Sequence, residues 1–197
     1  TRAFNIACIE TEGYEADDII ATLARQATAA GGDVTIISSD KDLMQLVGTC
    51  RHGADGEACI DMLDTMKNQR IWLEEVEEKF GVGPELVGDV LALMGDAVDN
   101  VPGIYGIGPK TASKLIAEHG SLTAALDSAP DMKPSKLKER LIEGRADAEL
   151  SKVLVTLKDD CDLPQPLEDM VLGPVPPEPL AAFLQQHGFT SLLRRLD

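Results

Sequence analysis

The feature that most constrains this chain is a glycine-rich segment near its middle, residues 95–111. It holds three glycines in a short interval, Gly103, Gly106 and Gly108. Glycine tolerates positive φ and lets another backbone approach closely, and Pro109 suits the first position of a helix, where a missing N–H costs nothing. The segment therefore predicts a tight hairpin that leads into a helix N-terminus, where free backbone N–H groups can bind phosphate oxygens.

Length and composition fit one ordinary globular domain, or one with a smaller appendage, with a core built mainly from aliphatic side chains. The chain has 197 residues, of which 44% are hydrophobic and only 4% aromatic. No apolar run approaches the roughly 20 residues that span a membrane, and nothing in the sequence suggests a secretory leader. We therefore expect no membrane partner and a cytoplasmic protein whose four cysteines are reduced.

The net charge of −16 argues against a general nucleic-acid coat, but the charge is uneven along the chain. Residues 1–100 carry 20 acids and seven bases, whereas residues 101–197 carry 14 acids and 11 bases. Seven of the bases lie between Gly103 and Arg145, against five acids. A DNA-facing surface is therefore expected in the second half of the chain.

Three groups of acids lie at the ends of predicted helices or strands. Helix capping accounts for one or two acids in a first turn, but three in four positions repel one another and need a positive partner. The second group directly follows a predicted strand, where ligands collect in open α/β sheets. The groups are Glu15, Asp17 and Asp18; Asp40 and Asp42; and Asp96 and Asp99.

A divalent cation would relieve the repulsion within these groups if the fold brings them together. Hard carboxylate oxygens suit Mg²⁺ or Mn²⁺, and two such ions roughly 4 Å apart can activate water and stabilise the leaving oxygen in phosphodiester hydrolysis. The acids therefore predict a two-metal hydrolytic site beside the phosphate-binding hairpin.

Hydrophobic periodicity predicts an α/β region followed by an all-helical region. We expect a short buried strand at Ile6–Ile9, a helix that begins near Ile19 and is closed by a glycine pair, and a buried parallel strand over residues 33–38. Beyond Lys110 the spacing is helical, interrupted by a proline-rich stretch. The predicted organisation is an α/β core over residues 1–94 and a helical region over residues 95–197.

Taken together, the motifs resemble those of the 5′-nuclease family, which includes the 5′→3′ exonuclease domain of bacterial DNA polymerase I and the flap endonucleases. The resemblance covers essentially the whole chain. It rests on three motifs in the family's order and approximate spacing: Gly-Tyr-Glu-Ala-Asp-Asp, Ser-Asp-Lys-Asp-Leu, and Gly-Asp-x-x-Asp-Asn-x-Pro-Gly-x-x-Gly-Ile-Gly-x-Lys-Thr-Ala. The fold that it implies is a PIN-like core, a partial parallel sheet flanked by helices, followed by a helix–hairpin–helix region.

The resemblance implies a metal-dependent 5′→3′ exonuclease and flap endonuclease that acts in DNA replication and repair on 5′-flap, nicked or primer-bearing duplexes, with a polymerase domain in the parent chain. By motif position, Glu15, Asp17 and Asp18 hold the first metal region, and Asp40, Asp42, Asp96 and Asp99 hold the second. The hairpin and the helix after it grip the duplex backbone, with a K⁺ ion at the hairpin carbonyls. The implied DNA-binding residues are Gly103, Gly106, Ile107, Gly108, Lys110, Thr111 and Lys114.

The chain departs from the family pattern at its start. The family places a strand-end aspartate, a second strand with another aspartate, and residues that bind the 5′ strand before the first motif found here. We therefore expect these 197 residues alone to cleave weakly or not at all. We also expect an exposed edge or apolar face on the sheet, through which chains can associate.

Three other functions remain open from the residues alone. A non-catalytic helix–hairpin–helix DNA-binding module explains the hairpin but leaves seven grouped acids without a role. A metal-dependent phosphohydrolase of small molecules explains the acids but not the hairpin. A purely structural interpretation treats every acid as a helix cap or as surface charge.

Overall fold

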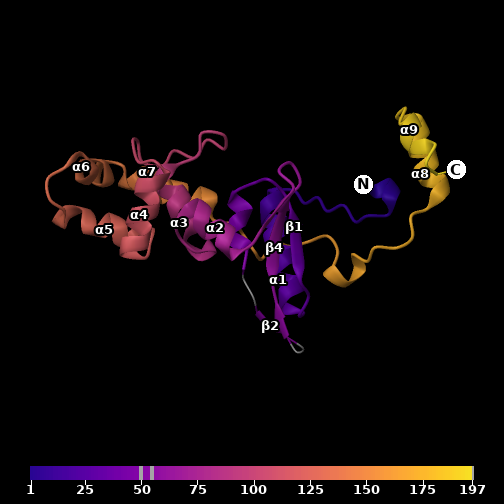
Figure 1. Ribbon diagram of the computed structural model, residues 1–197, viewed down its shortest axis with the longest axis horizontal. Helices are drawn as coiled ribbons and strands as arrows, with labels where there is room; N and C mark the ends of the chain where they lie inside the picture. The colour runs from indigo at the N-terminus through magenta and orange to yellow at the C-terminus, as the bar shows by residue number, and fades with distance from the viewer. Residues whose placement is uncertain (49–50, 54–55, 197) are drawn as a thin grey trace.

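The computed structural model describes residues 1–48, 51–53 and 56–196. The chain is elongated, with a helical unit at one end, a small sheet in the middle and the C-terminal helices beyond the sheet (Figure 1). Within the described residues, no helix is long and apolar enough to cross a membrane.

The central sheet has three strands in the order β1–β4–β5, built from β1 (Val34–Ile37), β4 (Ile60–Asp64) and β5 (Gln69–Ile71). Strands β1 and β4 are parallel, in a register that places Val34 opposite Ile60, and β5 is antiparallel to β4. A separate antiparallel pair is formed by β2 (Arg51–Gly53) and β3 (Gly56–Ala58). The dipeptide Asp55-Gly56, which is typical of a hairpin turn, falls partly outside the described residues.

Two strand predictions need correction. Residues 6–9 form no strand, because in the described structure they pair with no neighbouring strand and run as irregular backbone. Strand β1 is parallel as predicted, but it lies at the sheet edge rather than between two strands, and its last residue, Ile37, is 67% exposed. The expected exposed sheet edge is therefore present among the described strands.

The helices follow the predicted order. The helix predicted near Ile19 is α1 (Ala16–Ala29), and a 3-10 helix, η2 (Asp42–Leu46), follows β1. Ser121 and Ser135 cap α5 and α6, each accepting a hydrogen bond from a backbone N–H three residues later. The remaining α-helices are α2 (Leu73–Phe80), α3 (Pro84–Met94), α4 (Pro109–His119), α5 (Leu122–Ser128), α6 (Lys136–Glu143), α7 (Arg145–Val155), α8 (Pro177–Gln186) and α9 (Thr190–Leu193).

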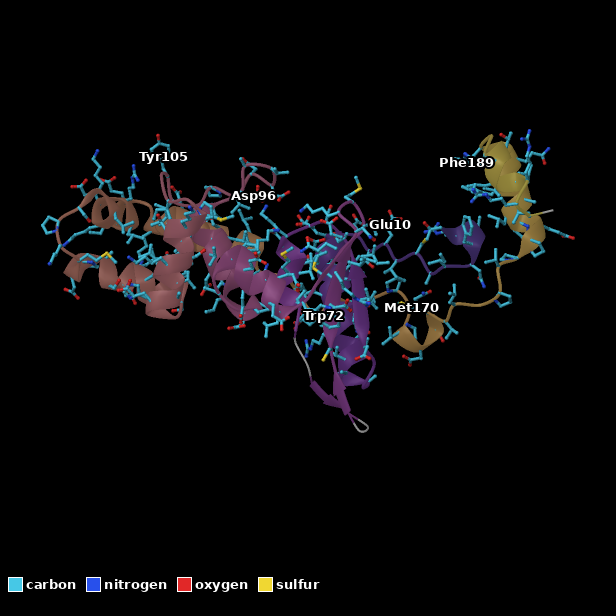
Figure 2. The ribbon with its side chains drawn as sticks, viewed as in Figure 1. Glu10, Trp72, Asp96, Tyr105, Met170 and Phe189 are labelled. Atoms are coloured by element: carbon cyan, nitrogen blue, oxygen red, sulfur yellow. The ribbon has the colours of Figure 1, made fainter. Side chains whose placement is uncertain are left out.

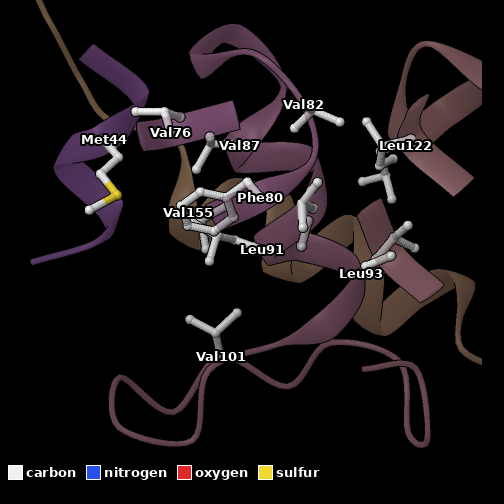
Figure 3. Close-up of a cluster of buried hydrophobic side chains, with 14 of the residues drawn as sticks. Met44, Val76, Phe80, Val82, Val87, Leu91, Leu93, Val101, Leu122 and Val155 are labelled. Carbon is white, nitrogen blue, oxygen red and sulfur yellow. The ribbon is translucent and has the colours of Figure 1, made fainter. Parts of the chain in front are cut away.

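Helix α3 is the centre of the core and joins the sheet region to the helical end. It packs against η2 and α2 on one side and against α4 and α7 on the other. Leu91 and Val87 are fully buried, and Phe80 and Val155 contribute to the same cluster (Figure 3). Because the acids at 96 and 99 directly follow α3, this packing fixes where they lie relative to the sheet.

The cysteine prediction is partly wrong. Cys8 and Cys161 are free thiols, as expected. Cys59, which directly follows β3, is disulfide-bonded. Spacing along the sequence did not reveal this, because a disulfide depends on which residues the fold brings within reach of each other.

Candidate metal centre and nucleic-acid interface

The first acidic group caps α1, and its members have different environments. Glu15 is the N-cap residue, and its backbone N–H donates to Asp18 Oδ2 at 3.3 Å. Asp18 Oδ1 accepts a hydrogen bond from the backbone N–H of Lys158 at 2.9 Å. Both oxygens of Asp18 therefore have protein partners, which ties α1 to the segment after α7.

Asp17 has no such partner among the described residues and lies close to the charges of the second acidic group. Its pKa is raised from 3.8 to about 6, first by burial and then by the charges of Asp40 and Asp42, with smaller contributions from Glu15 and Asp18. The carboxyl end of β1 and the first turn of α1 therefore face each other, although more than 20 residues separate them in the sequence.

The second group is a tight turn at the end of β1. The backbone N–H of Asp40 donates to Ser38 Oγ at 3.0 Å, and that of Asp42 donates to Asp40 Oδ1 at 3.1 Å. Burial raises the pKa of Asp42, and the nearby charges of Asp40 and Asp99 raise it further, against the opposing effect of Lys41.

Asp42 Oδ1 is buried and has no hydrogen-bond partner within the described structure. A buried carboxylate oxygen left unpaired costs roughly 1–3 kcal/mol or more, so its presence indicates a missing positive partner. A hard divalent cation coordinated by carboxylates fits this position.

The third group follows α3. Asp96 is 8% exposed, and its backbone makes two hydrogen bonds with Val101, at 2.9 Å and 2.7 Å. Asp96 Oδ1 accepts from the backbone N–H of Val98 at 2.8 Å, and Oδ2 forms an ion pair with Lys41. The Lys41 ammonium therefore supplies the positive charge that the buried Asp96 needs.

A pocket of about 400 Å³ lies where the second and third groups meet. Asp40 and Asp99, both exposed, line it together with Ser38, Lys41 and Lys79. Neither lysine was among the predicted site residues. The position of Lys41 inside the Ser-Asp-Lys-Asp motif could have indicated a role in the site, whereas nothing in the sequence around Lys79 does so.

The structure thus brings most of the predicted acids into one electrostatic neighbourhood without assembling a finished metal site. Asp17, Asp40, Asp42 and Asp99 are linked by their mutual effects on pKa. Asp18 and Asp96 face the same region but are engaged by Lys158 and Lys41. Over the described residues, no three His, Cys, Asp or Glu side chains are grouped closely enough to hold an ion as they stand.

The hairpin predicted at residues 103–108 is present and leads into α4. Gly103 has φ 57°, and its N–H donates to Ser151 Oγ at 2.8 Å. A Cβ at Gly103 would lie 2.3 Å from the backbone nitrogen of Gly95, so only glycine fits there. Arg140 donates to the Gly106 carbonyl at 2.9 Å, which fixes the turn against α6.

The face that the hairpin presents to solvent suits phosphate oxygens. Gly108 is the N-cap of α4 and has open space around it, and its N–H donates no hydrogen bond to any described residue. Lys110 and Lys114 are exposed one helical turn apart, and Thr111 is partly exposed. Tyr105, 90% exposed, projects from the tip of the hairpin on the same edge of the molecule as Asp96 (Figure 2).

Ile107 differs from its predicted DNA-binding neighbours. Its side chain is only 3% exposed and its N–H donates to the carbonyl of Ile104 at 3.0 Å. Its contribution to the interface is therefore to anchor the hairpin in the core.

Comparison with solved structures shows the same fold in bacteriophage T5 nucleases. T5 5′-exonuclease with bound zinc ions matches with a TM-score of 0.65 and 26% identity, over 75% of this chain and 52% of that one. A T5 flap endonuclease in a pseudo-enzyme–product complex with DNA and metal ions matches with a TM-score of 0.63 and 23% identity, over 94% of this chain and 61% of that one.

Curated relatives match along the whole chain. DNA polymerase I of Rhizobium leguminosarum is 50% identical over 196 residues, and DNA polymerase I of Pseudomonas aeruginosa is 41% identical over 199 residues. The chain spans 18% and 21% of the length of these two proteins. The 5′-3′ exonuclease of Aquifex aeolicus is 38% identical, over 98% of this chain and 62% of that protein.

Two family descriptions together account for most of the sequence. The resolvase-like N-terminal domain of 5′-3′ exonucleases matches residues 1–81, and their C-terminal SAM fold matches residues 82–178. The sheet with α1 and the helical unit with its hairpin correspond to these two parts. The chain therefore belongs to the 5′-3′ exonuclease family, in the form found in DNA polymerase I.

Proposed function

We propose that this chain provides the metal-dependent 5′→3′ exonuclease and flap endonuclease activity of a DNA polymerase I, acting on 5′-flap, nicked or primer-bearing duplex DNA. The observation that carries the proposal is that acids from three segments of the chain, at Asp17, at Asp40 and Asp42, and at Asp99, lie close enough to raise one another's pKa, with an orphaned carboxylate oxygen on Asp42. The bound metals and DNA named for the T5 structures support it.

The carboxylates of residues 15–18, 40–42 and 96–99 are proposed to hold Mg²⁺ or Mn²⁺. When bound, these ions activate water and stabilise the leaving oxygen of a phosphodiester. The chain's own contribution is to place hard oxygens at the end of β1 and the start of α1, where the fold holds them against their repulsion. Lys41 neutralises Asp96 until a metal does so.

The helical region over residues 95–197 is proposed to hold the duplex and to deliver the strand to the metals. The N-terminus of α4 and the exposed Lys110 and Lys114 contact phosphates without reading bases. Arg140 already supplies a positive group at the Gly106 carbonyl. The proposal therefore requires Mg²⁺ or Mn²⁺ but no K⁺ ion at that oxygen.

The test is Mg²⁺-dependent cleavage of a 5′-flap duplex by the natural polypeptide that carries this sequence. Asp42→Asn is expected to lower the rate at least 100-fold, because the orphaned oxygen loses the charge that attracts the metal. Glu85→Gln, which changes an exposed acid in the first turn of α3, is expected to leave the rate unchanged. Cleavage that persists in EDTA, or that Asp42→Asn leaves intact, contradicts the proposal.

The rival proposal is a DNA-binding module without catalysis. A measurement of Mn²⁺ binding distinguishes it from the nuclease proposal. The rival predicts flap binding with no more Mn²⁺ uptake than a generic acidic surface shows. The nuclease proposal predicts saturable Mn²⁺ binding that Asp42→Asn weakens.

A further inference from the structure

The first half of the chain has only three lysines, and Lys79 lies near both of the others. They are Lys41, Lys67 and Lys79. Lys79, on α2, lines the pocket of about 400 Å³ that contains Asp40 and Asp99, and it also lines a neighbouring pocket of about 390 Å³ with Lys67. Such clustering is unexpected in a segment with 20 acids and seven bases, where lysines can spread out among acids.

Lys79 differs from the other two lysines because it forms no ion pair with an acid in the part of the chain that the structure describes. Lys41 pairs with Asp96, and Lys67 Nζ lies 3.5 Å from Asp64 Oδ2. Among the described residues, the contacts of the Lys79 ammonium are the sulfur of Met44 at 3.6 Å and the ring of Phe80, whose centroid is 5.4 Å away.

The surroundings of Lys79 favour an anion. Burial lowers the pKa of Lys79, and the charges of Lys67 and Lys41 lower it further, while Asp64 and Asp40 offset only part of this effect. Two other lysines lie near this ammonium, and no described carboxylate is within ion-pair distance of it. A bound anion would therefore stabilise its charged form.

The simpler interpretation is a surface lysine that lays its stem along α2 and keeps its ammonium in water. That interpretation explains the contact with Phe80 but not the position of the ammonium between two pockets. Nor does it explain why Lys79 and Lys41 both lie beside the proposed metal ligands Asp40 and Asp99.

We propose that Lys79 binds a phosphate of the nucleic-acid strand, next to the carboxylates of Asp40 and Asp99. The inference rests on the proposed function and adds a strand contact on α2, on the sheet side of the metal centre. An ammonium binds phosphate oxygens as a compact point charge and carries no base preference. Lys79 is therefore a substrate-binding residue that holds the strand in the pocket, not a metal ligand.

The experiment measures kcat/KM for a 5′-flap duplex against NaCl concentration, using the natural polypeptide. Lys79→Gln is expected to lower kcat/KM about 10-fold at low salt, mainly through KM, and to reduce the salt slope by about one phosphate contact. Lys79→Arg keeps the charge and is expected to restore most of the loss. Arg195→Gln removes a positive charge near the distant C-terminus and serves as the matched control (Figure 1).

Two further readouts keep the result specific. Mn²⁺ affinity measured by calorimetry is expected to be unchanged in Lys79→Gln, and a thermal melt checks that the variant is folded. If Lys79→Gln matches Arg195→Gln in kcat/KM and in salt slope, this inference is wrong while the proposed function stands. If the unaltered polypeptide shows no metal-dependent cleavage, the proposed function fails and the inference falls with it.

Discussion

Asp17 is expected to destabilise the metal-free protein, so Asp17→Asn should stabilise it. The pKa of Asp17 is raised from 3.8 to about 6 by burial and by the acids of the neighbouring segment. The folded state therefore binds this proton more tightly than the unfolded state does. Stability contributed by the protonated form is present below about pH 4 and is lost as the pH rises through about 6.

The magnitude follows from the size of the shift. A shift of about two units corresponds to roughly 3 kcal/mol at neutral pH, but the carboxyl is only partly buried, and solvent screening reduces this figure. Asp17 also lies in the first turn of α1, where a negative charge gains roughly 0.3–1 kcal/mol from the helix dipole. We therefore expect Asp17→Asn to raise the free energy of unfolding by about 1 kcal/mol at pH 7.5.

The assay is thermal unfolding followed by circular dichroism in EDTA, at pH 7.5 and at pH 4. A gain of about 1 kcal/mol raises the Tm by roughly 2–4 °C for a chain of this size, and the gain should vanish at pH 4, where Asp17 is protonated in the unaltered chain. Saturating Mn²⁺ should stabilise the unaltered chain more than the variant.

The control is Glu85→Gln, because Glu85 is likewise the second residue of its helix but is exposed. We expect that change to leave the Tm unchanged or to lower it slightly. If Asp17→Asn lowers the Tm in EDTA at pH 7.5 as Glu85→Gln does, the claim that Asp17 lies in a repulsive cluster is refuted.

Two further predictions concern the supports of the site. Lys41→Met removes the ion-pair partner of the buried Asp96, so we expect urea unfolding in EDTA to show a free energy of unfolding lower by roughly 2 kcal/mol. Adding Mn²⁺ should restore part of this stability. An unchanged free energy of unfolding would show that the ion pair does not stabilise the fold. Gly103 has a positive φ, and Gly103→Ala would place a Cβ against the backbone of Gly95. We therefore expect this change to lower the free energy of unfolding by about 3 kcal/mol or more. Gly108→Ala, in open space, is the matched change and should cost less than about 1 kcal/mol; equal losses would contradict the close packing of the hairpin.

Much of the fold could be predicted from local signals. Helical spacing predicted the helix near Ile19, which is α1, and helical structure beyond Lys110, and Pro109 marked the start of α4. The irregular backbone at residues 6–9 and the edge position of β1 could not be predicted, because apolar β-branched residues indicate a strand without showing which strand pairs with it.

The candidate site was predictable in its residue types but not in its pairing. Motif spacing identified the acids, because each group lies at the end of a predicted element. Sequence did not reveal that Asp18 is bound by a backbone N–H about 140 residues away, or that Lys41 pairs with Asp96. Such long-range contacts depend on how α3 and α7 pack, which no local pattern encodes.

The central claim is that acids from separate segments form one metal centre, and Mn²⁺ calorimetry on a double-mutant cycle tests it most directly. Asp17 and Asp99 belong to different segments, and the cycle compares Asp17→Asn, Asp99→Asn and the double variant with the unaltered chain. The account predicts that each single change weakens Mn²⁺ binding and that the two effects are coupled rather than additive. Independent effects, or Mn²⁺ binding that neither change alters, would contradict it.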